Sequence, residues 1–183
     1  MLYQIDKIML WFYNSNMKKL FTFLFSALFS IAYAGSDNWH SEVVPGEGVN
    51  PIGFIYYTGA LGTKVLNKKE KTDTALEFIC SYTGDAPVMS IFWRGYLAKD
   101  DVTINTFIDN KLFNAPTKWS VDGELIYIDL VKSTELIKQL KNARTVRFQW
   151  SVGEVQETAS YSVAFNMTGV DFSDFNAKCN TLL

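Results

Sequence analysis

Apolar and polar side chains alternate with a period of two residues through much of this chain, and no other feature constrains its fold so strongly. In Leu76–Tyr82 every second residue is apolar or aromatic, and Thr145–Trp150 and Tyr161–Phe165 repeat the pattern. Successive side chains of a strand point to opposite faces, so this alternation is typical of strands with one face in a core. Further strands are expected at Ile52–Tyr57, Val88–Trp93, Val102–Ile108, Thr117–Val121 and Glu124–Ile128.

Two short segments have the apolar spacing of helices instead. Ser133–Ala143 places three apolar residues on one side of a helix. Asp171–Lys178 places Phe172 and Phe175 on one stripe, which Cys179 continues. Together with the strands, these segments predict a mainly β fold, an antiparallel β-sandwich with two short helices.

The domain boundaries follow from where the periodicity starts. Residues 35–51 contain several glycines and prolines and have little periodicity, so we expect an irregular N-terminal arm there. Neither an internal repeat nor a linker interrupts the sequence after that point. We therefore expect a single β-sandwich domain over residues 52–183, which is long enough to bury a core of its own.

Residues 17–34 have the three-part design of a secretory signal peptide. Met17–Lys19 begins it with positive charge, residues 20–31 are nearly all apolar, and Ala32–Ala34 ends it with small residues. A membrane-spanning helix needs about 20 apolar residues, so the shorter run favours a cleaved signal over its alternative, an uncleaved anchor. We expect a periplasmic or secreted mature chain that starts at Gly35 and does not insert into a membrane.

A further stretch precedes this signal, although signal peptides begin at their charged region. Residues 1–16 contain only a short apolar run. The simplest interpretation is that translation starts at Met17 and that residues 1–16 are a non-native upstream extension.

The two cysteines, Cys80 and Cys179, both lie after the predicted signal. A lone pair of cysteines in an oxidising compartment is normally bonded. The alternative, a catalytic thiol, has little support because Cys80 is expected on the apolar face of a strand, where a thiol is unreactive. We therefore predict one disulfide that ties the C-terminal helix to the Leu76–Tyr82 strand.

The charge of the mature part argues against nucleic acid as a partner. After residue 34, Asp and Glu outnumber Lys and Arg, and no basic stripe is present. The basic residues Lys64, Lys68, Lys69 and Lys71 do cluster, but acidic residues interleave them. This cluster indicates a solvated hairpin tip more than a phosphate site.

Candidate catalytic residues are few. His40 is the single histidine, so a nucleophilic triad would have to recruit it from the N-terminal arm. A zinc site needs three or four ligands, which one histidine and two paired thiols do not supply. Asp100 and Asp101 precede a strand and are typical of a turn. We therefore expect neither a catalytic residue nor a metal site nor a cofactor.

Aromatic residues supply the one candidate recognition patch, at Trp93, Arg94 and Tyr96. Two large aromatics flank an arginine at the expected end of a strand, and such a group can bind a sugar or a peptide. The alternative interpretation, which we favour, is an edge strand covered by a stacked arginine.

Two sets of segments share a pattern with a known family. The first is Leu76–Cys80, Val88–Trp93 and residues 117–120, and the second is Ala159–Val170, which leads to a short helix and Cys179. Together they resemble the small exported bacterial proteins of the VasI/TagO type, which are associated with type VI secretion. The resemblance covers about residues 70–183 and implies a fold with an early and a late cysteine, without catalytic residues.

These observations lead to one functional hypothesis and its alternatives. The chain is expected to be a non-enzymatic, exported envelope binding or accessory module that contacts a protein or a glycan, with a possible link to type VI secretion. One alternative is an envelope hydrolase that uses carboxylates such as Asp100 or Asp101. The other is a periplasmic inhibitor of a foreign enzyme or a phage-exclusion factor.

Overall fold

The computed structural model describes residues 38–45, 51–82, 86–96, 100–153 and 158–180. The predicted signal peptide and the stretch before it lie outside these residues. Among the described helices, none has the length and apolar character needed to cross a lipid bilayer.

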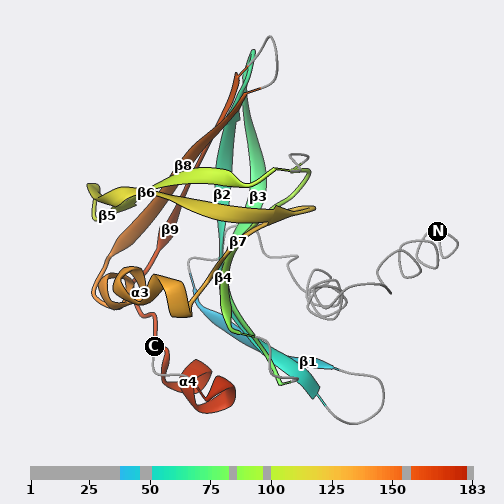
Figure 1. Ribbon diagram of the computed structural model, residues 1–183, viewed down its shortest axis with the longest axis vertical. Helices are drawn as coiled ribbons and strands as arrows, with labels where there is room; N and C mark the ends of the chain where they lie inside the picture. Colours follow the sequence, from blue (N-terminus) through green and yellow to red (C-terminus); the bar gives the residue numbers. More distant parts are fainter. Residues whose placement is uncertain (1–37, 46–50, 83–85, 97–99, 154–157, 181–183) are drawn as a thin grey trace, which may run out of the picture.

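Eight strands form a closed antiparallel barrel (Figure 1). They are β2 (Pro51–Val65), β3 (Lys69–Ser81), β4 (Val88–Trp93), β5 (Val102–Ile108), β6 (Lys111–Asp122), β7 (Leu125–Asp129), β8 (Thr145–Gly153) and β9 (Thr158–Asn166). Around the wall their order is β2-β3-β4-β7-β6-β5-β8-β9, and β9 pairs with β2 to close the circle. The prediction of a mainly β fold is therefore confirmed.

The predicted β-sandwich is wrong, and pairing between β2 and β9 is the reason. Thr63 lies opposite Ser162, and Val65 lies opposite Ser160, so the first and last barrel strands share a ladder. A sandwich would leave these two strands as edges of separate sheets. Closure removes those edges and gives every barrel strand two neighbours.

The strand β2 is long enough to serve two partners on the same side. Its last residues pair with β9, whereas its first residues pair with a ninth strand, β1 (His40–Pro45), at the opposite end of the barrel. Beyond the closed part, β1, β2 and β3 therefore continue as a small open sheet (Figure 1). The predicted irregular arm is thus wrong over 40–45, which form a strand.

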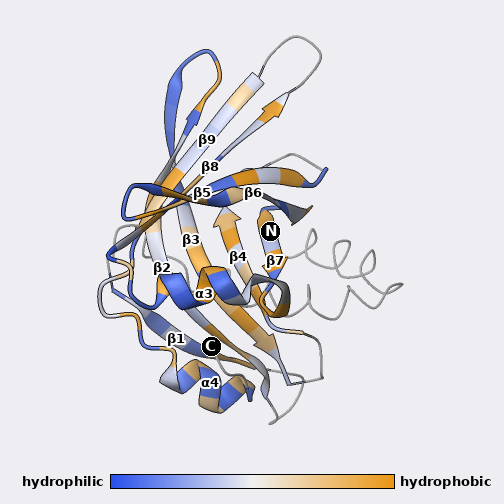
Figure 2. Ribbon diagram, turned by 60° about the vertical axis from the view of Figure 1, so that its left-hand side comes forward, coloured by the Kyte–Doolittle hydropathy of each residue, from blue (hydrophilic) through white to orange (hydrophobic). Residues whose placement is uncertain are grey.

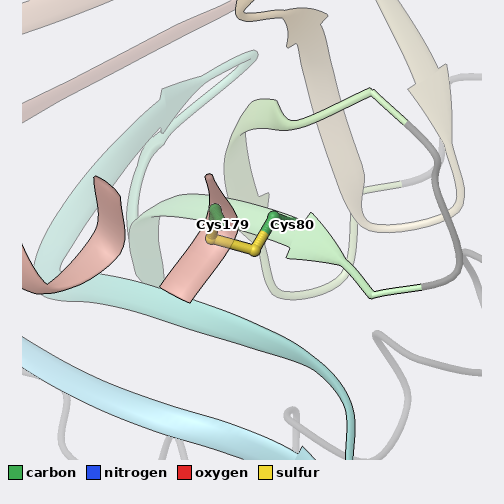
Figure 3. The surroundings of a disulfide bond; sticks show 2 residues. All are labelled: Cys80 and Cys179. Atoms are coloured by element: carbon green, nitrogen blue, oxygen red, sulfur yellow. A yellow bond between two sulfur atoms is a disulfide. The ribbon is translucent and has the colours of Figure 1, made fainter. Parts of the chain in front are cut away.

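The helix α4 (Ser173–Cys179) packs on the inner face of this open sheet. The ring of Phe175 lies 6.1 Å from that of Phe54 on β2, and Phe172 meets Phe78 on β3 edge to face. Cys179 forms the predicted disulfide with Cys80 of β3, with 5.8 Å between the Cα atoms (Figure 3). The bond fastens a short terminal helix, of about two turns, that would otherwise fray.

The barrel interior is the main hydrophobic core. Alternate residues of the barrel strands enter it, and the largest of its fully buried side chains are Trp93, Trp119, Phe54, Phe78, Phe148, Phe165 and Phe175. The 3-10 helix η2 (Val131–Ser133) and the helix α3 (Thr134–Leu140) connect β7 to β8, and α3 buries its apolar side on this core. Figure 2 shows the same division, with hydrophobic colour along β3 and β4 and hydrophilic colour prominent on α3.

Candidate functional site

The predicted recognition patch is not on the surface. The exposed fractions of Trp93 and Tyr96 are only 2% and 3%, because both side chains lie inside the barrel. Arg94 is exposed, and its guanidinium is 2.7 Å from the carboxylate of Asp73. The edge-strand alternative is wrong as well, because β4 has β3 and β7 on its two sides.

Trp93 and Tyr96 instead belong to a cluster of four interior aromatic residues with Trp150 and Tyr161. Trp150 stacks on Tyr161 at 5.3 Å, and Trp93 meets both rings edge to face at 5.2 Å. The indole N–H of Trp150 donates to the Tyr96 hydroxyl at 3.2 Å. Burial raises the pKa of Tyr96 to about 12 because it disfavours the phenolate, although the hydrogen bond from Trp150 opposes the shift. The cluster fills one part of the barrel interior and ties β4 to β8 and β9.

The other candidate catalytic residues are not brought together. His40 lies on β1 with its ring 5.6 Å from that of Tyr57, whereas Asp100 and Asp101 precede β5 on a different part of the wall. Asp101 is paired with Lys118 at 3.0 Å. In the described part of the chain, no group of three or more His, Cys, Asp or Glu side chains is placed to hold a metal ion.

A buried carboxyl that the sequence analysis missed lies on the outer wall of the barrel. Glu77 of β3 is only 2% exposed, and Ser90 of β4 donates a hydrogen bond of 2.8 Å to its carboxyl oxygen. Burial raises the pKa of Glu77 to about 7, although the bond from Ser90 opposes the shift. The residues beside it form a second, smaller hydrophobic cluster, whose buried members are Val44, Ile55, Ala75, Ile79, Val88, Phe92 and Leu125.

The outer wall carries a second feature, a groove where the barrel closes. It has a volume of about 300 Å³ and crosses four neighbouring strands, β2, β9, β8 and β5. We call it the polar groove; its lining residues are Thr63, Val65, Asn105, Gln149, Trp150, Ser151, Ser160, Tyr161 and Ser162. This volume is at the small end of the range for ligand sites.

Strand alternation explains why the groove is polar. On β8 and β9 the apolar residues of the Thr145–Trp150 and Tyr161–Phe165 patterns point into the barrel. The residues between them, such as Gln149 and Ser162, therefore point outward. Among the described lining residues none carries a full charge at neutral pH, and most bear a hydroxyl or a primary amide.

The register places these side chains in rows. Thr63, Ser162, Gln149 and Asn105 are successive partners across the four strands, so they form one continuous row. Val65, Ser160 and Ser151 form the next row.

Hydrogen bonds inside the rows are long. The amide of Gln149 is 3.4 Å from the Ser162 hydroxyl, and the Ser151 and Ser160 hydroxyls are also 3.4 Å apart. Hydrogen bonds of these types are usually closer to 2.8–3.0 Å, and each group can make more than one. The groove can therefore donate to and accept from a ligand, and among its described lining residues none is a carboxylate, a histidine or a thiol that could act as a general acid, base or activated nucleophile.

A second hollow, of about 290 Å³, lies between the end of α3 and α4. One of its lining residues, Asp171, already accepts a hydrogen bond from the backbone N–H of Ser173. These backbone and side-chain bonds lower the pKa of Asp171, which thus serves to start the helix. The polar groove is the better candidate for a ligand.

Comparisons of the chain with models of known protein families, with curated proteins and with solved structures found no match. The polar groove therefore rests on geometry and chemistry alone. Its residues were missed in the sequence because small polar residues that alternate with apolar ones resemble any solvent-facing side of a strand.

Proposed function

We propose that this chain is an exported, non-enzymatic binding module of the cell envelope, which contacts its partner through the polar groove. The observation that carries the proposal is the groove itself, a concave surface built from hydrogen-bonding side chains without an ionised group among the described ones. Such a lining binds and orients a ligand without the acid–base pair that hydrolysis needs.

Export is supported by two independent features. The disulfide between Cys80 and Cys179 fits an oxidising compartment, where such bonds persist. Residues 17–34 have the composition of a secretory signal. A periplasmic or secreted location agrees with both.

The resemblance to VasI/TagO-type proteins supports an accessory role beside a type VI secretion system. The strand that contains Cys80, the corner at Phe165–Gly169 and the helix that ends at Cys179 are the segments that carry it. On this proposal the barrel is the scaffold and the polar groove is the contact surface.

Co-sedimentation with isolated cell envelopes tests this function. The mature protein, residues 35–183, is compared with the double variant Gln149→Leu/Ser162→Val, which removes two hydrogen-bonding side chains from the central row. The matched control is Thr103→Val, an exposed position on β5 that does not line the groove.

The wild type and the control should sediment with the envelopes, and the groove variant should remain in the supernatant. Equal sedimentation of all three proteins would overturn the proposal, as would the absence of sedimentation of the wild type. Release of soluble sugars or peptides from the envelopes by the wild type would favour a hydrolase instead.

A further inference from the structure

We infer that the polar groove binds a neutral oligosaccharide. This inference rests on the proposed function and specifies the chemistry of the ligand. The residues that carry it are the four of the central row, Thr63, Ser162, Gln149 and Asn105, with Ser151 and Ser160 beside them.

The hydrogen-bonding groups of the lining match those of a sugar. A hydroxyl both donates and accepts hydrogen bonds, and a primary amide offers two donors and an acceptor oxygen. A sugar presents hydroxyls of the same dual character along its length. Rows of serine, threonine, asparagine and glutamine can therefore pair with successive sugar hydroxyls in either direction.

The length of the central row also suits a chain of sugars. Neighbouring strands lie about 4.8 Å apart, so four strands carry the central row over about 14 Å. The row from Thr63 to Asn105 thus extends beyond one sugar ring and suits a short chain of sugars.

The side chains of the groove are held in place by the packing beneath them. Trp150 and Tyr161 line the groove, and they are stacked in the barrel with rings 5° from parallel. The row residues alternate with these anchored side chains on paired strands. A lining that is held in place before binding loses less conformational entropy when the ligand arrives.

Other ligand classes fit the groove less well. Nucleic acid and phosphate need cations, and none of the described lining residues is a cation. Lys64, between Thr63 and Val65 in sequence, lies with its Nζ 5.9 Å from the ring centroid of Tyr161, and the Arg147 guanidinium lies 4.2 Å from the ring centroid of Phe107. A protein partner needs buried apolar anchors, and Val65 is the one exposed aliphatic side chain among the described lining residues.

Titration of the isotope-labelled mature protein with neutral trisaccharides, followed by NMR, tests the inference. The probes are maltotriose, cellotriose and N-acetylchitotriose, and an acidic galacturonate trimer is the comparison. With at least one neutral probe, the side-chain amide signals of Asn105 and Gln149 and the backbone signals of Ser160 and Ser162 should shift in a saturable way.

The variant Gln149→Leu/Ser162→Val should weaken this binding at least tenfold, and Ser162→Val alone should weaken it less. Thr103→Val should bind as the wild type does. Each variant is checked by its NMR spectrum in the absence of sugar, so that a loss of fold is recognised. Because Ser162→Val changes one outward side chain, it keeps the test valid if the double variant does not fold.

The outcomes separate this inference from the proposed function. No shift with any neutral probe, shifts outside the groove, or preference for the acidic trimer would each overturn the inference. If the groove-dependent sedimentation with envelopes persisted in those cases, the binding function would stand with a ligand of another class. If sedimentation and sugar binding were both lost, both would fail.

Discussion

Glu77 is a buried carboxyl whose ionisation opposes folding. Its pKa is raised from 4.5 to about 7 because the barrel wall buries it, so the folded protein holds a proton that the unfolded chain has released. The stabilisation is complete below about pH 4.5 and is lost as the pH rises through about 7. Its size is about 3 kcal/mol, from the value of one pKa unit.

We predict that Glu77→Gln removes this pH dependence. The free energy of unfolding, measured with urea between pH 4.5 and 8, should fall with pH in the wild type and stay nearly level in the variant. Glutamine still offers Ser90 an acceptor oxygen, so the fold is retained. The matched control is Glu135→Gln on α3, an exposed position. If the free energy of unfolding of Glu77→Gln fell with pH as steeply as that of the wild type, Glu77 would not be the cause of the pH dependence.

Gly62 of β2 is required for close packing against the aromatic cluster. A Cβ atom at this position would lie 2.6 Å from the ring of Trp93 and 2.7 Å from a methyl carbon of Thr74. The indole is held by Trp150 and Tyr161 and has little room to move. The hydrogen of glycine is therefore the only substituent that fits there.

We predict that Gly62→Ala destabilises the protein by about 1–3 kcal/mol, the usual cost of overpacking. Gly153→Ala is the matched control, because its Cβ would lie 3.8 Å from the nearest side-chain atom, an ordinary contact. Thermal unfolding should show a lower midpoint for Gly62→Ala and little change for Gly153→Ala. Similar unfolding midpoints for the two variants would show that the ring of Trp93 can move to make room for the added methyl group.

The phase of alternation also explains the error at Trp93. Met89, Ile91 and Trp93 of β4 share the inward face, and this phase was readable from the sequence. The prediction of a surface recognition patch rested instead on the neighbouring Arg94 and Gly95. Tyr96 lies beyond the turn, where alternation says nothing about direction, so its burial could not be predicted.

Most elements of secondary structure could be predicted, whereas their partners could not. The apolar period located β3, β4, β5, β8 and β9 and both α-helices. The register between strands depends on contacts across the barrel. Strand β2 is the clearest example, because it pairs with β1 at one end and with β9 at the other. No local pattern distinguishes such a closed wall from two stacked sheets.

The helix α4 depends on its disulfide more than on its own length. It has seven residues, and it is anchored by Phe175 and by the bond from Cys179 to Cys80, which are 99 residues apart in sequence. An isolated helix of this length is not stable in water. A loop of about 100 residues gives an entropic stabilisation of about 4–5 kcal/mol.

We predict that reduction of the bond, or the double change Cys80→Ser/Cys179→Ser, lowers the free energy of unfolding by a few kcal/mol. Amide exchange in α4 should rise before exchange in the barrel strands does. Urea unfolding and hydrogen exchange of oxidised and reduced protein measure the two effects. Equal stability in both states would show that Phe172 and Phe175 hold the helix unaided.

The molecule as a whole combines a barrel with a packed interior and the polar groove on its outer wall. Its interior is filled by aromatic and aliphatic side chains, and the binding surface that we propose lies on the outer wall, where β2 meets β9. The location of the groove follows from closure: Thr63 and Val65 come beside Ser162 and Ser160 only because the first and last barrel strands pair. An open sandwich would separate them, which is why the sequence alone did not reveal the site.

The most direct test of this account is an NMR map of the labelled mature protein mixed with isolated cell envelopes, without any assumption about the ligand. Signals from the outward residues of the polar groove, above all Thr63, Gln149, Ser160 and Ser162, should lose intensity first. Signals from the opposite wall, such as those of Ser90 and Tyr127, should persist. Uniform intensities, or losses centred on the opposite wall, would contradict the claim that the groove is the binding surface.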